Sequence, residues 1–174
     1  TAQAYHNEEG VGEALAECGL PREEFFLTTK VWITSAGYEK ARASIEESMR
    51  KLRTDYLDLL LIHQPFGDYY GTYRAMEELY KAGRLRAIGV SNFLTDDLEN
   101  LLAACTIRPM VNQILTHIAN TPLELIDFCR KNDVLCEAYS PIAHGEALKN
   151  AGIVRMAERY GVTPAQLCVR YVLQ

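Results

Sequence analysis

The feature that most constrains the fold is a series of five short apolar runs distributed along the chain. Each run is rich in β-branched or aromatic residues, which is typical of β-strands. The runs begin 23 to 32 residues apart, an interval that holds one strand, one helix and two loops. This alternation predicts an α/β fold with a mostly parallel sheet. The five predicted strands are residues 25–32, 57–64, 87–93, 110–117 and 135–142.

The segments between these runs have helical patterns. Residues 38–52 place their apolar side chains on one face, which predicts an amphipathic helix. Residues 8–18 and 73–82 are each followed by a glycine, which commonly ends a helix. Two Thr-Pro-x-Glu/Gln sequences, at 121–124 and 163–166, predict capping boxes with proline at the first helical position.

Polar residues recur near the carboxyl ends of the predicted strands, and they decide between two parallel-sheet architectures. No G-x-G-x-x-G follows a strand, which disfavours an open sheet of the dinucleotide-binding type. A closed (β/α)8 barrel places its chemistry at the carboxyl ends of its strands. We therefore predict a TIM barrel from these residues: Lys30, His63, Ser91 with Asn92, Asn112 with Gln113, and Tyr139 with Ser140.

The chain is short for a complete barrel. Eight strand–helix units take about 250 residues, whereas this chain has 174 and holds five strand-like runs. We expect residues 1–174 to form one domain, a partial barrel from which two strands before Thr1 and one after Gln174 are missing. Such a fragment is expected to be inactive on its own and prone to self-association through its open strand edges.

Composition narrows the class of protein. The chain is 48% hydrophobic and 24% charged, with no apolar stretch near the ~20 residues of a membrane-spanning helix. Its net charge of −5 makes nucleic acid an unfavoured partner. The five cysteines lack metal-ligand spacing, so we expect no zinc site and interpret all five as buried, reduced thiols of a cytoplasmic protein.

Each polar candidate has a structural alternative. Lys30 is either an edge-strand lysine that prevents aggregation or a charge at the barrel mouth that stabilises a neighbouring phenolate or carboxylate. His63 is either a hydrogen-bonded core residue or a group that binds a carbonyl. The amide and hydroxyl pairs either cap loops or hold a carboxamide, and Tyr139 either fills the core or stacks on a flat ring.

Six motifs together resemble the aldo-keto reductases, and most closely the bacterial branch that reduces small carbonyl compounds. In order, they are T-A-Q-A-Y-H-N-E, T-T-K-V-W, L-L-I-H-Q-P, G-V-S-N-F, V-N-Q-I and E-A-Y-S-P-I. The resemblance implies a (β/α)8 barrel that binds NADPH, with NADH possible, and needs no separate dinucleotide-binding domain. It also implies an oxidoreductase that reduces aldehydes or ketones by hydride transfer.

The resemblance assigns roles to individual residues. Tyr5 matches the proton donor, Lys30 the residue that tunes it, and His63 the residue that orients the carbonyl, so we expect these three to converge. Trp32 matches a wall of the substrate pocket. The implied contacts to the nicotinamide and pyrophosphate are Ser91, Asn92, Gln113, Tyr139, Ser140 and Ile142.

Three departures and two alternatives accompany this assignment. The family's lysine-pairing aspartate and its adenosine-phosphate segment fall outside residues 1–174, and Gln64 replaces an aromatic residue common in animal members. One alternative function is a non-catalytic, nicotinamide-binding regulatory subunit of the same superfamily. Another is an unrelated phosphate-binding barrel lyase or isomerase. The expected partner is a small carbonyl compound, not a membrane or nucleic acid, with the intact protein monomeric.

Overall fold

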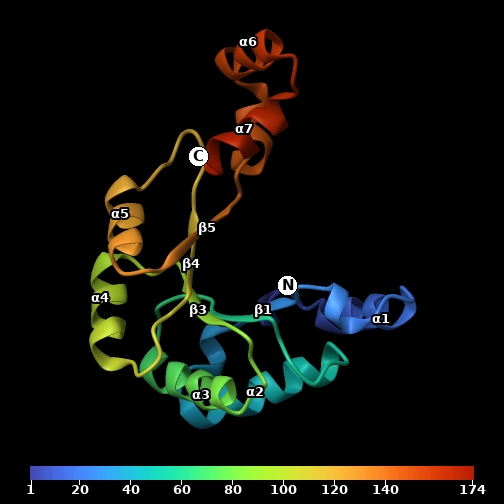
Figure 1. The fold of residues 1–174 in the computed structure, drawn as a ribbon, viewed down its shortest axis with the longest axis vertical. Coiled ribbons are helices and arrows are strands. Elements are labelled where there is room, and N and C mark those ends of the chain that lie inside the picture. Colours follow the sequence, from blue (N-terminus) through green and yellow to red (C-terminus); the bar gives the residue numbers. More distant parts are fainter. The chain divides into compact units, whose positions relative to one another are not determined.

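The computed structural model describes residues 1–174 and divides into two compact units, Thr1–Asn112 and Gln113–Gln174 (Figure 1). Five strands alternate with helices in sheet order β1-β2-β3-β4-β5. Each of the five predicted runs contains one strand, so the predicted parallel α/β fold is confirmed. The strands are β1 (Thr28–Val31), β2 (Leu59–Ile62), β3 (Ile88–Ser91), β4 (Val111–Leu115) and β5 (Leu135–Tyr139).

In the first unit, β1, β2 and β3 pair in parallel. Lys30 lies opposite Leu61, and Leu61 lies opposite Gly89. All four residues of β2 are buried, as expected for a central parallel strand covered on both faces. Gly89 is required here, because a Cβ at this position would run into the carbonyl oxygen of Val111 and the Leu61 side chain.

Four helices belong to the first unit, and α2 and α3 pack against each other, side by side in Figure 1. The apolar face predicted for residues 38–52 is confirmed, because Ala41, Ile45 and Met49 are buried in α2. Helix α3 begins earlier than the predicted residue 73, because the Asp68 carboxylate accepts a hydrogen bond from the Gly71 backbone N–H at 2.8 Å. The helices are α1 (Glu8–Glu17), α2 (Tyr38–Lys51), α3 (Tyr69–Lys81) and α4 (Thr95–Ala104).

Helix α1 approaches α2 closely at one glycine. A Cβ at Gly12 would overlap the backbone of Lys51 and Leu52, at the end of α2. Glycine therefore permits a backbone-to-backbone contact that no larger residue allows. Short 3₁₀ helices complete the first unit: η1 (Gln3–Tyr5), η2 (Arg22–Glu24) and η3 (Ile33–Ser35).

The second unit contains the remaining helices and a small apolar cluster. Ala147, Ile153 and Cys168 are buried in this cluster, and Ile142 packs against it. The capping box at 163–166 is confirmed, since Thr163 and Gln166 exchange hydrogen bonds at 3.2 and 2.8 Å and Pro164 opens the helix. The elements are α5 (Leu123–Lys131), η4 (Ala143–Lys149), α6 (Ala151–Tyr160) and α7 (Pro164–Val172).

The capping box predicted at 121–124 is wrong. Helix α5 begins at Leu123, and no side chain caps it. The Thr121 hydroxyl instead donates to the His117 carbonyl at 3.2 Å and lies 2.7 Å from the Tyr171 hydroxyl. The Thr121 hydroxyl, which the local pattern predicted to cap α5, therefore interacts with residues outside this helix.

The prediction of five buried cysteines is also wrong in part. None of the five cysteines forms a disulfide, but only Cys129 and Cys168 are buried. Cys18 is exposed, because it caps the solvent-facing end of α1, and Cys105 and Cys136 are half-buried. None of the helices combines the length and apolar character that crossing a bilayer requires.

Candidate active site

The carboxyl ends of β1 and β2 bring together four predicted site residues in the first unit. Val31 pairs with Ile62, so the residues that follow them, Trp32 and His63, emerge side by side. Their ring centroids are 4.9 Å apart, with an angle of 72° between the ring planes. The parallel register thus places these side chains at the end of the sheet where barrel enzymes carry their chemistry.

Tyr5 reaches this edge from η1, and Lys30 reaches it from β1. The Lys30 Nζ donates a hydrogen bond to the Tyr5 hydroxyl at 3.2 Å and lies 5.1 Å from the centre of its ring. Lys30 is only 6% exposed, so it is not a solvated edge lysine. An ammonium buried beside a phenol stabilises the phenolate form, which is the chemistry expected of a proton-donor pair.

His63 completes the group. Its ring meets the Tyr5 ring edge-on, with centroids 5.6 Å apart and an interplanar angle of 89°. Burial, followed by the nearby charge of Lys30, lowers the pKa of His63 to about 4. The imidazole is therefore neutral near pH 7, and its buried Nδ1 has no hydrogen-bond partner.

These three residues form the convergent group that the sequence predicted. A phenol supported by an ammonium can donate a proton, and a neutral imidazole can hydrogen-bond a polar ligand without transferring charge to it. The group therefore suits a reaction in which an oxygen atom gains negative charge and must be protonated. The chain has no cluster of three or more His, Cys, Asp or Glu side chains placed to hold a metal ion.

Ser91 and Asn92 lie at the end of β3. Ser91 is buried, and Asn92 adopts a left-handed backbone conformation with φ of 60°, which asparagine tolerates better than most residues. The Asn92 amide nitrogen donates to the His63 carbonyl oxygen and to the Ser91 hydroxyl, both at 3.1 Å. Asn92 thus ties the end of β3 to the residue that follows β2, which is the loop-capping role considered as its alternative.

The other predicted cofactor contacts lie in the second unit. The Gln113 amide nitrogen donates to the Glu137 carboxylate at 2.6 Å. Tyr139, the last residue of β5, is half-buried. Ser140 has φ of 52°, and its hydroxyl lies 3.2 Å from the His144 Nε2. Ile142 is half-buried against the apolar cluster of this unit.

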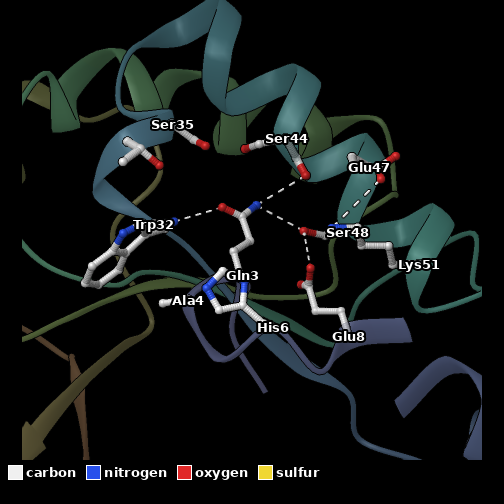
Figure 2. A pocket seen from close by; sticks show the side chains of 11 residues that line it. Gln3, Ala4, His6, Glu8, Trp32, Ser35, Ser44, Glu47, Ser48 and Lys51 are labelled. Carbon is white, nitrogen blue, oxygen red and sulfur yellow. Dashed lines mark hydrogen bonds and ion pairs between the residues drawn. The ribbon is translucent and has the colours of Figure 1, made fainter. Parts of the chain in front are cut away.

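Sequence reasoning missed two residues beside the convergent group, Gln3 and Glu8. The Gln3 amide bonds to the Trp32 backbone N–H and to Ser48, and Glu8 bonds to Thr29 and Ser48. Figure 2 shows both side chains lining a pocket of about 420 Å³ between η1 and α2. Their partners lie 21 to 45 positions away in the chain, so no local pattern could reveal them.

Comparison with known proteins gives consistent results. The model of the Aldo/keto reductase family matches residues 1–174. The chain is 47% identical to glyoxal reductase from Bacillus subtilis (strain 168), covering all of this chain and 63% of that protein. It is 42% identical to 9,11-endoperoxide prostaglandin H2 reductase from Trypanosoma cruzi (strain CL Brener), again over all of this chain and 63% of the relative.

Solved structures agree in fold. An aldo-keto reductase enzyme from a Medee basin deep-sea metagenome library superposes with a TM-score of 0.95 at 41% identity, covering 99% of this chain and 65% of that one. An aldo-keto reductase from Bombyx mori in complex with NADP gives a TM-score of 0.90 at 32% identity, covering 99% and 64%. The chain thus spans about 63–65% of the length of these relatives.

Proposed function

Because this chain belongs to the aldo/keto reductase family, we propose that it carries the catalytic residues of an NAD(P)H-dependent oxidoreductase. The reaction is the reduction of an aldehyde or ketone to an alcohol. Relatives named as reductases of glyoxal and of methylglyoxal support this class of activity. Substrates as small as glyoxal fit the bacterial resemblance best.

The observation that carries the proposal is the 3.2 Å hydrogen bond between Lys30 and Tyr5 beside the neutral ring of His63. In the proposed reaction, a bound nicotinamide would supply the hydride that adds to the carbonyl carbon. The C=O π bond breaks, and the oxygen takes the Tyr5 proton as negative charge develops on it. The product is the alcohol, and Tyr5 is left as phenolate beside the Lys30 ammonium, which stabilises it.

His63 has an orienting role in this proposal. A lowered pKa keeps the imidazole neutral, so it hydrogen-bonds the carbonyl oxygen instead of competing with Tyr5 as an acid. Holding that oxygen close to the phenol reduces the entropic part of the barrier. Trp32, in edge contact with His63, is the proposed wall of the substrate pocket.

The predicted cofactor residues fit a nicotinamide in chemical type. Hydroxyl and amide groups from Ser91, Asn92 and Gln113 complement a carboxamide, which needs both donors and acceptors. Tyr139 offers an aromatic face for stacking, and Ser140 and Ile142 follow it as proposed pyrophosphate contacts. The Bombyx mori relative in complex with NADP supports NADPH as the cofactor, and NADH stays an alternative.

The alternative function, a nicotinamide-binding regulatory subunit, needs no proton donor. The Tyr5–Lys30–His63 geometry is better explained by catalysis, since burying a lysine beside an exposed phenol contributes little to stability. Five cysteines without a disulfide are consistent with a reducing compartment, and we propose a cytoplasmic, monomeric enzyme.

Substitution Tyr5→Phe in the complete protein tests the proposal, and the same complete protein is the parent for every variant below. Carbonyl reduction should fall by about 10²- to 10⁴-fold, because the general acid is lost, whereas NADPH binding should be retained. The measurements are NADPH oxidation with glyoxal and cofactor binding by fluorescence. Tyr160→Phe, at an exposed tyrosine of α6, is the matched control. Near-normal turnover by Tyr5→Phe would refute the assignment, and cofactor binding without turnover in the parent would favour the regulatory alternative.

A further inference from the structure

Packing of its own side chain holds Tyr5 only in part. Tyr5 is 51% exposed, with one edge contact to His63, and its hydroxyl meets Lys30 at the end of a long side chain. Proton transfer nevertheless requires well-defined distances among Tyr5, Lys30 and the substrate. The backbone that carries Tyr5 must therefore be held by other contacts.

In addition to the hydrogen bond from the Thr1 nitrogen to the Thr28 carbonyl oxygen at 2.7 Å, two side-chain hydrogen bonds connect the segment around Tyr5 to β1 and to the residue that follows it. On one side, the Gln3 Oε1 accepts from the Trp32 backbone N–H at 2.9 Å. On the other, the Glu8 Oε1 accepts from the Thr29 hydroxyl at 2.6 Å. Tyr5 lies between Gln3 and Glu8 in sequence, and Lys30 lies between Thr29 and Trp32. The two reacting groups are thus bracketed by a pair of cross-links.

Helix α2 joins the two cross-links through one hydroxyl. The Ser48 Oγ accepts from the Gln3 Nε2 at 3.0 Å and donates to the Glu8 Oε2 at 3.3 Å. The Gln3 Nε2 also donates to the Ser44 carbonyl oxygen at 3.2 Å. Figure 2 shows Gln3 at the centre of these contacts, with Ser48 between it and Glu8. We call these three residues the Gln3–Ser48–Glu8 network.

Two members of this network are buried. Ser48 and Glu8 are 1% and 4% exposed, so their hydrogen bonds are largely shielded from bulk water and costly to break. Glu8 is the first residue of α1, where the helix dipole favours a carboxylate. The close contact of α1 with α2 at Gly12 holds this helix end in place.

The network acts from the far side of the strand. Successive side chains of a strand point to opposite faces, so Thr29 and Lys30 project in opposite directions from β1. Glu8 binds Thr29, and the reacting groups meet at Lys30. Glu8 therefore influences the reaction only through the positions of β1 and η1.

We propose that Gln3 and Glu8, joined through Ser48, are positioning residues that hold Tyr5 against Lys30. This inference rests on the proposed function, because it concerns the geometry of the proposed proton donor. Loss of the network lets η1 move relative to β1. The Tyr5 hydroxyl then moves away from the ammonium, whose stabilisation of the phenolate weakens with distance.

The decisive variant is Glu8→Met, which keeps the length of the side chain and removes both acceptor oxygens. We expect kcat for carbonyl reduction to fall by roughly 10- to 100-fold, the range caused by a displacement of about 1 Å, with KM for NADPH unchanged. The pH profile of alcohol oxidation should move to higher pH. Glu8→Gln keeps one oxygen for Thr29 and an amide for Ser48, so it should restore the parent kcat and profile.

Glu77→Met is the matched control. Glu77 is equally buried in α3 and accepts hydrogen bonds from Thr106 and Ile107, both at 2.6 Å. Its substitution should lower the melting temperature without moving the pH profile. If Glu8→Met does not fold, Ser48→Ala removes the bridging oxygen with almost no change in volume and should shift the profile in the same direction.

The outcomes separate this inference from the proposed function. An inactive Tyr5→Phe together with parent-like kcat and pH profile in Glu8→Met, or in Ser48→Ala where Glu8→Met does not fold, would overturn the positioning role alone. A Glu8→Met profile that changes no more than that of Glu77→Met would do the same. Full activity of Tyr5→Phe would overturn the proposed role of Tyr5 and this inference with it.

Discussion

The two ends of β2 differ in how completely their buried polar groups are hydrogen-bonded. Asp58 precedes the strand and is 3% exposed, yet its carboxylate accepts hydrogen bonds from the Leu27 N–H at 2.9 Å, from Arg22 at 2.8 Å and from Arg86 at 2.9 Å. His63 follows the strand, and its buried Nδ1 has no partner. The buried carboxylate at the Asp58 end has hydrogen-bond partners on both oxygens, whereas the buried ring nitrogen at the His63 end has none.

The hydrogen bonds at the Asp58 end of β2 stabilise the fold. The guanidinium groups of Arg22 and Arg86 each lie 4.1 Å from the centre of the Tyr56 ring while they bind Asp58. Burial alone would raise the pKa of Asp58, but the Leu27 N–H and the two arginines more than offset it and hold that pKa below its usual value. A buried charge with this many donors stabilises the fold.

The His63 end of β2 is suited to binding a ligand. A ring nitrogen without a partner lowers stability unless a ligand or water meets it. Barrel enzymes place their chemistry at the carboxyl ends of strands and their stabilising contacts at the amino ends. Within β2, the end whose buried ring nitrogen has no partner is the end at the candidate active site.

The strongest test of this division is Lys30→Met. Turnover should fall by about 10²-fold or more, because the phenolate of Tyr5 loses its stabilising charge, and the pH optimum of alcohol oxidation should rise. Stability should stay level or increase, since a buried ammonium with a single neutral partner is replaced by an apolar chain of similar length. Steady-state kinetics and urea unfolding measure the two effects. An unchanged rate and profile would make Lys30 structural.

Asp58→Asn should give the converse result. We expect a loss of about 2–3 kcal/mol in the free energy of unfolding, because charge-assisted hydrogen bonds to two arginines are weakened. The kcat of the folded fraction should stay at the parent value, since Asp58 lies at the opposite end of β2 from His63. Chemical denaturation and activity per folded molecule provide the comparison. A fall in kcat as large as that of Lys30→Met would contradict the proposal that the Asp58 end of β2 serves stability and the His63 end serves function.

The pH dependence of stability should separate the two ends. The folded pKa of His63 is about 4, below its ordinary 6.5. Between these values the unfolded chain binds a proton there and the folded chain does not, so stability falls as the pH drops from 6.5 to about 4. We expect a loss of roughly 1–2 kcal/mol from this half-buried group.

The Asp58 contribution behaves differently, because its folded pKa is lowered. Its stabilisation is present above the unfolded pKa of about 3.9 and is lost only as the pH falls through the lower, folded value. Urea unfolding of the parent and of His63→Gln at a series of pH values tests whether the His63 contribution to stability is lost at higher pH than the Asp58 contribution. The parent should show the steeper decline between pH 6.5 and 4, and parallel curves would count against the neutral buried state of His63.

The sequence predicted the elements more successfully than their ends. The apolar face of residues 38–52 and the box at 163–166 depend on local periodicity and capping, which the folded chain retains. The failure at Thr121 came from the carbonyl of His117 and the hydroxyl of Tyr171, one of them 50 positions away. Local rules cannot foresee such a partner.

The candidate site was predicted through resemblance, not through spacing. Tyr5 and Lys30 are 25 positions apart, and nothing local connects a tyrosine in a loop with a lysine in a strand. The convergence of the two agrees with the prediction, whereas their catalytic roles stay predictions. Gln3 and Glu8 escaped notice because an amide and an acid near a helix start also suit an ordinary solvated surface.

Trp32 is the only tryptophan in the chain, and its indole ring lies 4.9 Å from the imidazole of His63. Within residues 1–174, indole fluorescence therefore comes from a single position at the candidate site. Under the proposed function, its emission should respond to protonation of His63, to a bound carbonyl compound and to a bound nicotinamide. Each variant discussed above can then be followed at the candidate site without an added label.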